Sequence, residues 1–203
     1  MNLFKKLSLV VCAATYLLSS SAIAQPLDTG KKVIVVYYSR SGNNIRNGEI
    51  VNLKVGNTAV VANKIHDLIK SDTYEIKTVK EYPEDYRETT RVAQEEFENN
   101  VRPELKGELP KLENYDVMII GTPIWWGTMP TAVMSFLEKV DCTNKIILPY
   151  TTHEGSGLGR VVRNVKEIAR GDNIKVTEGL AIRGSDVQNC DADVKEWILN
   201  NLK

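Results

Sequence analysis

Two adjacent tryptophans, Trp125 and Trp126, follow the apolar run 117–121, which ends in a glycine. A loop normally crosses the protein surface, and two indoles exposed there are unfavourable unless something flat covers them. The pair therefore predicts a site for a planar aromatic ligand. The alternative is ordinary packing, with one indole in the core and the other partly exposed.

A second polar loop, 39–44, follows the β-branched run 33–38, and Gly56-Asn57-Thr58 opens a helical pattern. Hydroxyls, amides and glycines between a strand and a helix start are typical of an anion-binding nest. Capping of the helix by Asn57 or Thr58 is the alternative, and it is compatible with phosphate binding. The spacing matches no nucleotide-triphosphate loop. The predicted phosphate-site residues are Ser39, Arg40, Ser41, Gly42, Asn43, Asn57 and Thr58.

The third unusual loop, 151–159, has three glycines and three hydroxyl side chains, which permit close approach of the backbone to a ligand. Its predicted ligand contacts are Thr152, His153, Gly155, Ser156 and Gly157. His153 and Glu154 suggest acid–base chemistry, but a histidine in a polar turn is more often a structural hydrogen-bonding group. We therefore predict no catalytic and no metal-ligating residue.

Alternating strand and helix patterns position these loops. Strands are predicted over 33–38, 74–79, 117–120, 145–150 and 175–182, and helices over 58–69, 85–99, 131–140, 158–169 and 193–202. Strict alternation predicts an α/β three-layer sandwich with a five-stranded parallel sheet, for which the strand order 2-1-3-4-5 is one of the two common solutions. The insertion 45–56 carries Asn47-Gly48, a hairpin turn signal. All three loops then meet at the carboxyl ends of the strands.

The N-terminus is typical of a secretory signal peptide, with two lysines, an apolar run and a small-x-small ending over residues 1–24. We expect cleavage after Ala24, a single domain over 25–203, and an exported protein, periplasmic or secreted, without a permanent membrane anchor. Removing Lys5 and Lys6 leaves 24 basic and 26 acidic residues, a net charge of −2. That balance argues against nucleic acid as a partner. Cys142 and Cys190 fall at opposite ends of the sheet, so no disulfide between them is expected.

Taken together, these motifs resemble the flavodoxin family. The resemblance rests on Ser39 to Asn43, Val55 to Thr58, Trp125 to Thr128 and Thr152 to Gly157, and it covers nearly all of the chain after residue 24. It implies FMN as cofactor, with the phosphate in the first loop and the isoalloxazine ring between the second and third. Either half of the divided first loop, Asn43-Asn44 or Asn57-Thr58, is then a candidate for the phosphate.

The same resemblance implies that Pro123, Trp125, Trp126 and Gly127 contact the ring. The peptide between Trp126 and Gly127 falls where flavodoxins meet flavin N5. Residues expected to line the approach to the ring are Tyr82, Tyr86, Trp125 and Arg40.

The function expected from the sequence is an exported FMN redox protein. It would transfer electrons to a redox partner protein or reduce a small acceptor such as a quinone. One alternative is an NAD(P)H-dependent flavin or quinone reductase of the same fold. Another is a non-redox module that binds a different aromatic phosphate.

Overall fold

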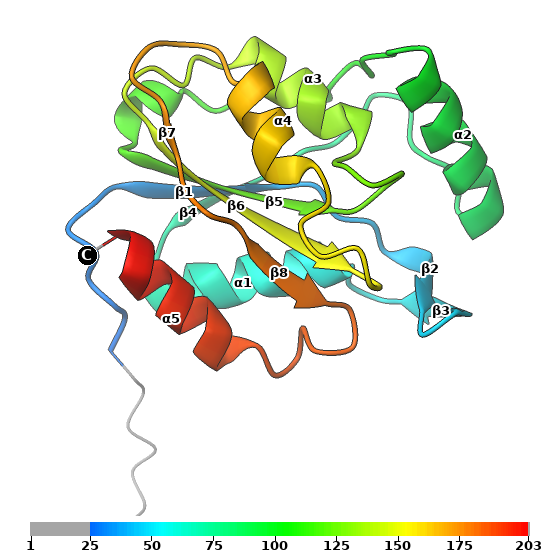
Figure 1. Ribbon diagram of the computed structural model, residues 1–203, viewed down its shortest axis with the longest axis horizontal. Helices are drawn as coiled ribbons and strands as arrows, with labels where there is room; N and C mark the ends of the chain where they lie inside the picture. The colour runs from blue at the N-terminus through cyan, green and yellow to red at the C-terminus, as the bar shows by residue number, and fades with distance from the viewer. Residues whose placement is uncertain (1–24, 203) are drawn as a thin grey trace, which may run out of the picture.

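The computed structural model describes residues 25–202 and has a parallel sheet between two helical layers (Figure 1). The strand order is β4-β1-β5-β6-β7, with β8 also paired to β6. This confirms the predicted α/β fold and the order 2-1-3-4-5. The predicted signal peptide, 1–24, lies outside the described residues. The strands are β1 (Val33–Tyr37), β4 (Asp72–Glu75), β5 (Val117–Pro123), β6 (Ile146–His153), β7 (Lys175–Val176) and β8 (Leu180–Arg183).

The sheet has six strands rather than the predicted five because the last strand is divided into β7 and β8. Ile147 pairs with Val176 and Tyr150 pairs with Leu180, so three steps along β6 correspond to four along the last strand. Pro149 lies in this interval and has no N–H to donate to a neighbour. The extra residue therefore forms an irregular, bulge-like break that separates the two pairing segments.

Side chains alternate between two cores, one on each face of the sheet. Along β1, Ile34 and Val36 belong to one buried cluster, and Val33 and Val35 belong to the other. This follows from the two-residue period of a strand buried on both sides. The first cluster packs under α3 (Thr131–Lys139) and α4 (Val161–Ile168). The second packs under α1 (Asn57–Ile69) and α5 (Asp191–Leu202), on the opposite side of the sheet in Figure 1.

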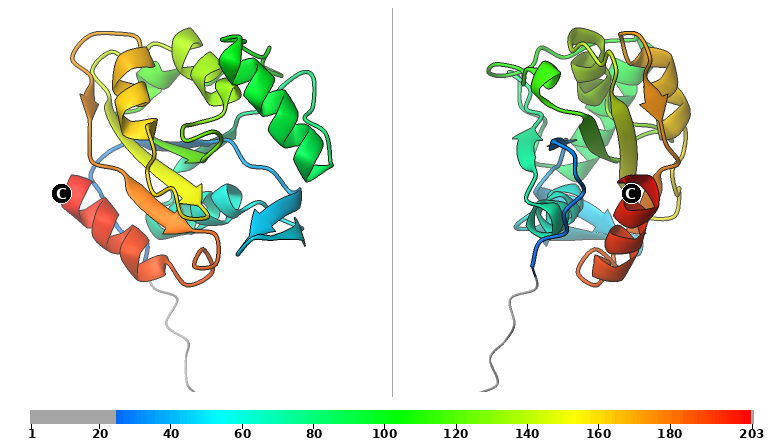
Figure 2. Two further views of the ribbon diagram at one scale, coloured as in Figure 1. Left: turned by 45° about the vertical axis from the view of Figure 1, so that its right-hand side comes forward. Right: turned by 90° about the vertical axis from the view of Figure 1, so that its left-hand side faces the viewer.

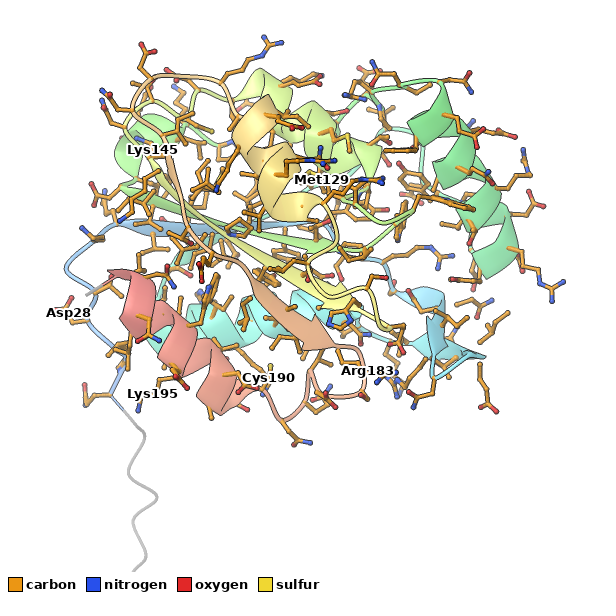
Figure 3. All side chains as sticks on the ribbon, viewed as in Figure 1. Asp28, Met129, Lys145, Arg183, Cys190 and Lys195 are labelled. Atoms are coloured by element: carbon orange, nitrogen blue, oxygen red, sulfur yellow. The ribbon has the colours of Figure 1, made fainter. Side chains whose placement is uncertain are left out.

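The two cysteines among residues 25–202 are free and buried in different cores. Cys142 belongs to the cluster under α3 and α4, together with Met129. Cys190 belongs to the cluster under α1 and α5. Figure 3 labels Met129 and Cys190 and shows them on opposite sides of the sheet.

A β-hairpin interrupts the connection from β1 to α1. It consists of β2 (Gly42–Arg46) and β3 (Glu49–Leu53), joined by Asn47 and Gly48, which both have positive φ. Positive φ at both central positions is the requirement of a tight type I′ turn. The hairpin was predicted within 45–56, but it begins at Gly42, so Gly42, Asn43 and Asn44 are strand residues.

The helix α2 (Tyr86–Glu98) and the hairpin both lie at the end of the sheet to which the arrowheads of β6 and β8 point (Figure 2). Only Thr89 and Ala93 of α2 are buried. Phe97, whose helical spacing with Val92 and Ala93 in the sequence predicts that it faces inward, is 39% exposed. Because both lie at this end of the sheet, the hairpin and α2 form walls around the carboxyl ends of the strands. No helix among residues 25–202 is long and apolar enough to cross a membrane.

Candidate functional site

The predicted loops converge on one cleft of about 250 Å³ at the carboxyl ends of the strands, which we call the main cleft. Its walls come from the loop after β1, the hairpin, the start of α1, the loops after β5 and β6, and the start of α2. Its lining residues are Ser39, Arg40, Asn44, Ile45, Asn57, Thr58, Tyr86, Pro123, Ile124, Trp125, Thr152, His153, Glu154 and Ser156.

The start of α1 forms the polar end of the main cleft. Its N-cap is Gly56, which supplies no capping side chain, and its first turn contains no acidic residue. Ser39 Oγ accepts the N–H of Ala59 at 3.0 Å, and the first intrahelical bond runs from Val60 N–H to Gly56 C=O. A helix start carries unpaired N–H groups and partial positive charge, so this end of the cleft suits an anion.

Gly56 brings the start of α1 directly against the loop after β1. A Cβ at this position would lie 2.4 Å from both the Arg40 carbonyl oxygen and Ser39 Oγ. Backbone atoms cannot move aside as a flexible side chain can, so a larger residue would push α1 away from Ser39. The Gly56-Asn57-Thr58 half of the divided loop is therefore the half placed beside Ser39.

Two buried hydrogen bonds attach the start of α1 to β6. Thr58 Oγ1 and Thr152 Oγ1 are 2.8 Å apart, and the Tyr150 hydroxyl donates to the Thr58 carbonyl at 3.0 Å. The Tyr150 ring occupies the space beside Gly121, where a Cβ would lie 2.0 Å from Tyr150 Cζ. Breaking either bond would leave a buried polar group without a partner, which is costly. The polar end of the cleft is thus rigidly positioned.

The tryptophan loop is a tight turn. Trp125 and Thr128 exchange backbone hydrogen bonds of 2.8 and 3.0 Å, and Trp126 and Gly127 both have positive φ. Arg160 holds this turn from α4: its guanidinium donates to the Trp126 carbonyl at 3.0 Å, and its backbone N–H donates to the Gly127 carbonyl at 2.9 Å. The carbonyl next to Gly127 is therefore held by a cation in this structure.

The two indoles have different surroundings. Trp125 lies in the wall of the main cleft and makes edge-to-face contacts with Tyr38 and Tyr82, at centroid distances of 5.5 and 5.1 Å. Trp126 is 45% exposed, and its indole N–H donates to the Thr90 carbonyl of α2 at 3.1 Å. Tyr82 thus supports Trp125 from behind. Trp125 is the indole presented to the main cleft, and Trp126 lies outside the lining of that cleft.

His153 and Glu154 have structural partners in the third loop. His153 Nδ1 accepts the N–H of Gly155 at 2.9 Å, which requires that nitrogen to be unprotonated. Burial, followed by the charge of Arg183, lowers the pKa of His153 and favours the same neutral form. Glu154 Oε2 accepts the N–H of Asn47 at 3.0 Å, so Glu154 ties the hairpin turn to the third loop.

Arg40 connects the hairpin to the segment that precedes α2. Its guanidinium donates to the carbonyls of Asn43, Pro83 and Glu84. Burial lowers the pKa of Arg40, although the bound carbonyls and the group's high intrinsic pKa leave it a cation. Arg40 was predicted as a phosphate contact. Here it lines the cleft while its donors hold backbone carbonyls together.

A second hollow of about 240 Å³ adjoins the main cleft, between α2 and the tryptophan turn, and we call it the side compartment. It shares Arg40, Asn44, Tyr86, Ile124 and Trp125 with the main cleft. The residues that line only the side compartment are Thr89, Thr90, Ala93 and Trp126.

The structure divides the predicted site residues into three groups, one of which is Trp126 alone, in the lining of the side compartment. Those in the main-cleft lining are Ser39, Arg40, Asn57, Thr58, Pro123, Trp125, Thr152, His153 and Ser156. Among the described residues, neither hollow's lining includes Ser41, Gly42, Asn43, Gly127, Gly155 or Gly157. Ser41 instead faces a separate surface hollow with Tyr82.

Two lining residues, Ile124 and Glu154, were not predicted as ligand contacts although each is next in sequence to a predicted residue. Asn44 also lines the cleft, and it was a candidate for the phosphate through the Asn43-Asn44 half of the first loop. Ile45, within the predicted insertion, reaches the cleft because the hairpin folds over it. Tyr86 was expected near the ring approach, and it lines both hollows. No group of three or more His, Cys, Asp or Glu side chains within 25–202 is arranged to hold a metal ion.

Comparison with known proteins identifies the family to which the chain belongs. A search of curated proteins found no match. Among solved structures, a flavoprotein from Lactobacillus acidophilus in complex with FMN is 26% identical with a TM-score of 0.58, over 82% of this chain and 98% of that one. A candidate flavoprotein from Bacteroides uniformis is 25% identical with a TM-score of 0.62, over 83% and 97%.

A candidate flavoprotein from Bacteroides eggerthii shares the fold, with a TM-score of 0.65 at 22% identity over 84% of this chain and 98% of that one. The sequence model described as flavodoxin matches residues 32–201, which include the described strands, helices α1 to α4, all of α5 but its last residue, and all three loops of the main cleft. On this match, the chain belongs to the flavodoxin family.

Proposed function

We propose that this chain binds FMN in the main cleft and acts as a redox protein. The observation that carries the proposal is the combination, in one cleft, of a helix start suited to an anion and the indole of a tryptophan. FMN carries both a phosphate and a planar aromatic ring. The family membership and the FMN-bound relative from Lactobacillus acidophilus support the same cofactor.

The donor set of the cleft fits FMN from one end to the other. The hydroxyl and amide side chains of Ser39, Asn57 and Thr58 surround the start of α1, where they and the backbone N–H groups would hold the phosphate. Ile124 and Trp125 offer apolar surface for the ring, and aromatic stacking contributes about 0.5–1.5 kcal/mol beyond the buried area. The backbone around His153 offers polar groups to a ring edge.

Bound FMN would supply one- and two-electron redox chemistry, and the protein would set its potential through local charges and hydrogen bonds. Arg160 is bonded to the Trp126 carbonyl of the tryptophan turn, and Arg40 lines the cleft itself. Neutral His153 adds no charge near or above neutral pH. The turn and these two arginine side chains are therefore the groups of this chain that would adjust the potential.

A fluorescence titration tests the cofactor. FMN emission should be quenched to a stoichiometry of one per chain, and riboflavin, which lacks the phosphate, should bind at least tenfold more weakly. Asn57→Ala should weaken FMN binding, whereas Asn43→Ala, in the other half of the divided loop, should not. The absence of FMN binding would contradict the proposal and favour a module for another aromatic phosphate.

The direction of electron flow is the finer part of the proposal. We favour transfer to a small acceptor or a redox partner protein over oxidation of NAD(P)H. Steady-state oxidation of NAD(P)H by the FMN-loaded protein would instead support a nicotinamide-dependent reductase. Slow NAD(P)H oxidation together with rapid reoxidation of the reduced protein by a quinone would support our reading.

The location outside the cytoplasm rests on residues 1–24 and is also proposed. Expression of the full chain in a bacterial host should give a mature protein that begins at Gln25 and is released with the periplasm. N-terminal sequencing and fractionation measure both. An intact N-terminus in the cytoplasmic fraction would contradict export.

A further inference from the structure

We infer that the side compartment binds a neutral planar molecule of one or two fused rings, with a quinone as the chemical class. The inference rests on the proposed function, because the compartment opens onto the end of the main cleft where the FMN ring would lie. The walls shared by the two hollows include Ile124, Trp125 and Tyr86. A ligand in the side compartment would therefore contact the cofactor rather than a remote surface.

The residues that bind the polar parts of FMN lie elsewhere. Asn57, Thr58 and Thr152 line the main cleft, and none of these three lines the side compartment. The side compartment is closed instead by the buried face of α2 at Ala93 and by the Trp126 indole. FMN anchored at the start of α1 leaves this second hollow for another molecule.

Most of the hydrogen-bond donors in its wall are already engaged, and this favours a neutral occupant. Thr89 Oγ1 donates to the Pro83 carbonyl at 2.6 Å, and Thr90 Oγ1 donates to the Tyr86 carbonyl at 2.8 Å. The Arg40 guanidinium holds three backbone carbonyls. A phosphate or carboxylate would find only the two remaining Arg40 N–H groups and the Tyr86 hydroxyl to accept from, whereas an apolar ring needs no donor.

The Tyr86 phenol differs from the hydrogen-bonded threonine hydroxyls in the wall of the side compartment. It lies in the wall of both hollows, and no partner engages its hydroxyl among the described residues. One phenolic O–H beside an apolar slot suits a ring that carries a carbonyl oxygen. A quinone has that combination of a flat ring and a carbonyl acceptor.

The size of the compartment limits the ligand further. At about 240 Å³ it is smaller than the roughly 300–1,000 Å³ of pockets that hold drug-sized ligands. One or two fused rings fit within such a space, whereas a nicotinamide dinucleotide would extend well beyond it. The compartment thus favours a small acceptor over a dinucleotide donor at this position.

Filling the compartment from α2 tests the inference. Ala93 is 5% exposed and lines only the side compartment, so Ala93→Leu should occupy it without touching the main cleft. Gln94→Leu is the matched control, because it adds the same side chain one position along the helix, outside both linings. Thr90→Ile is a second filling variant, should Ala93→Leu disturb α2.

The probe is 1,4-naphthoquinone, measured by calorimetry with the FMN-loaded protein, and the FMN dissociation constant of every variant is measured in parallel. We expect one naphthoquinone site, an affinity lowered at least tenfold by Ala93→Leu, and an FMN affinity within twofold of the unmodified chain. Gln94→Leu should change neither value. Thr90→Ile should act as Ala93→Leu does.

Two results would overturn the inference. An equal loss of FMN affinity in both filling variants would assign the compartment to the cofactor ring. Unchanged naphthoquinone binding in both, or none in the unmodified chain, would exclude the compartment as its site. Failure of the proposed function is distinguishable, because it appears as an absence of FMN binding in the unmodified chain before any quinone is added.

Discussion

Replacement of Gly56 by alanine tests the junction between the loop after β1 and the start of α1. The added Cβ would lie 2.4 Å from the Arg40 carbonyl oxygen, and Cβ contacts below 3.0 Å essentially never occur, so the two segments must separate by at least 3.0 − 2.4 = 0.6 Å. We expect such overpacking to cost about 1–3 kcal/mol of stability. The same shift moves the start of α1 away from Ser39. These two groups together frame the phosphate end of the cleft.

A displacement of 0.6 Å exceeds the roughly 0.5 Å tolerance of a well-positioned binding group. We therefore expect FMN affinity to fall by about tenfold or more, equivalent to ~1.4 kcal/mol. Riboflavin lacks the phosphate, so its affinity should fall much less. The ratio of the two effects, measured by fluorescence titration, isolates the phosphate end of the site from a general loss of stability.

Gly107→Ala is the matched control. A Cβ at Gly107 meets nothing within 4 Å, but its φ of +82° is unfavourable for alanine. This variant should lose about 1–2 kcal/mol of stability from backbone strain and keep its FMN affinity. If Gly56→Ala binds FMN normally, or weakens FMN and riboflavin equally, the placement of the phosphate at the start of α1 is wrong.

Three further outcomes are expected. Gly121→Ala should destabilise the protein by about 1–3 kcal/mol in urea unfolding, because its Cβ would meet the Tyr150 ring, and Tyr150→Leu should recover part of that loss in the double variant. The pKa of His153 is lowered, so an NMR titration should give a midpoint below pH 6.5, and a midpoint above 6.5 would contradict this. Because the folded state favours the neutral ring, the contribution of His153 to stability is present above pH 6.5 and is lost as the pH falls below it. Cys142 and Cys190 should stay unreactive toward a thiol reagent until unfolding, since both are buried and burial raises the pKa of Cys142 to about 11; reaction of the folded protein would contradict their placement.

The sheet and the layers could be predicted from local pattern alone. A continuous β-branched run such as 33–38 is stable only between two apolar layers, and the alternation of strands with helices limits the topology to a few solutions. The division of the last strand could not be predicted in this way. It depends on the register between Pro149 and a segment nearly thirty residues away, and register is a property of the pairing.

Phe97 shows that prediction from local pattern is limited in the same way for a helix. Its spacing with Val92 and Ala93 predicts an inner stripe, but α2 packs at the rim of the sheet rather than across its face. Phe97 is therefore left largely exposed, where the Arg160 guanidinium lies over its ring at 5.4 Å. Helical periodicity identifies which residues share a face, and only the packing of the helix decides whether that face is buried.

The candidate site, like the fold, could be predicted from the sequence only in part. The sequence by itself determined the chemistry, because a polar glycine-containing loop, a tryptophan pair and a second glycine-rich loop each follow a strand, and parallel strands bring their carboxyl ends to one edge. Tertiary structure alone decided that Gly56-Asn57-Thr58, rather than Asn43-Asn44, lies beside Ser39. It also decided that Trp125 lines the main cleft while Trp126 borders the side compartment. The physical reason is that these outcomes depend on contacts between distant segments, such as the fit of Gly56 against Arg40 and the bond from Trp126 to α2, which local sequence does not encode.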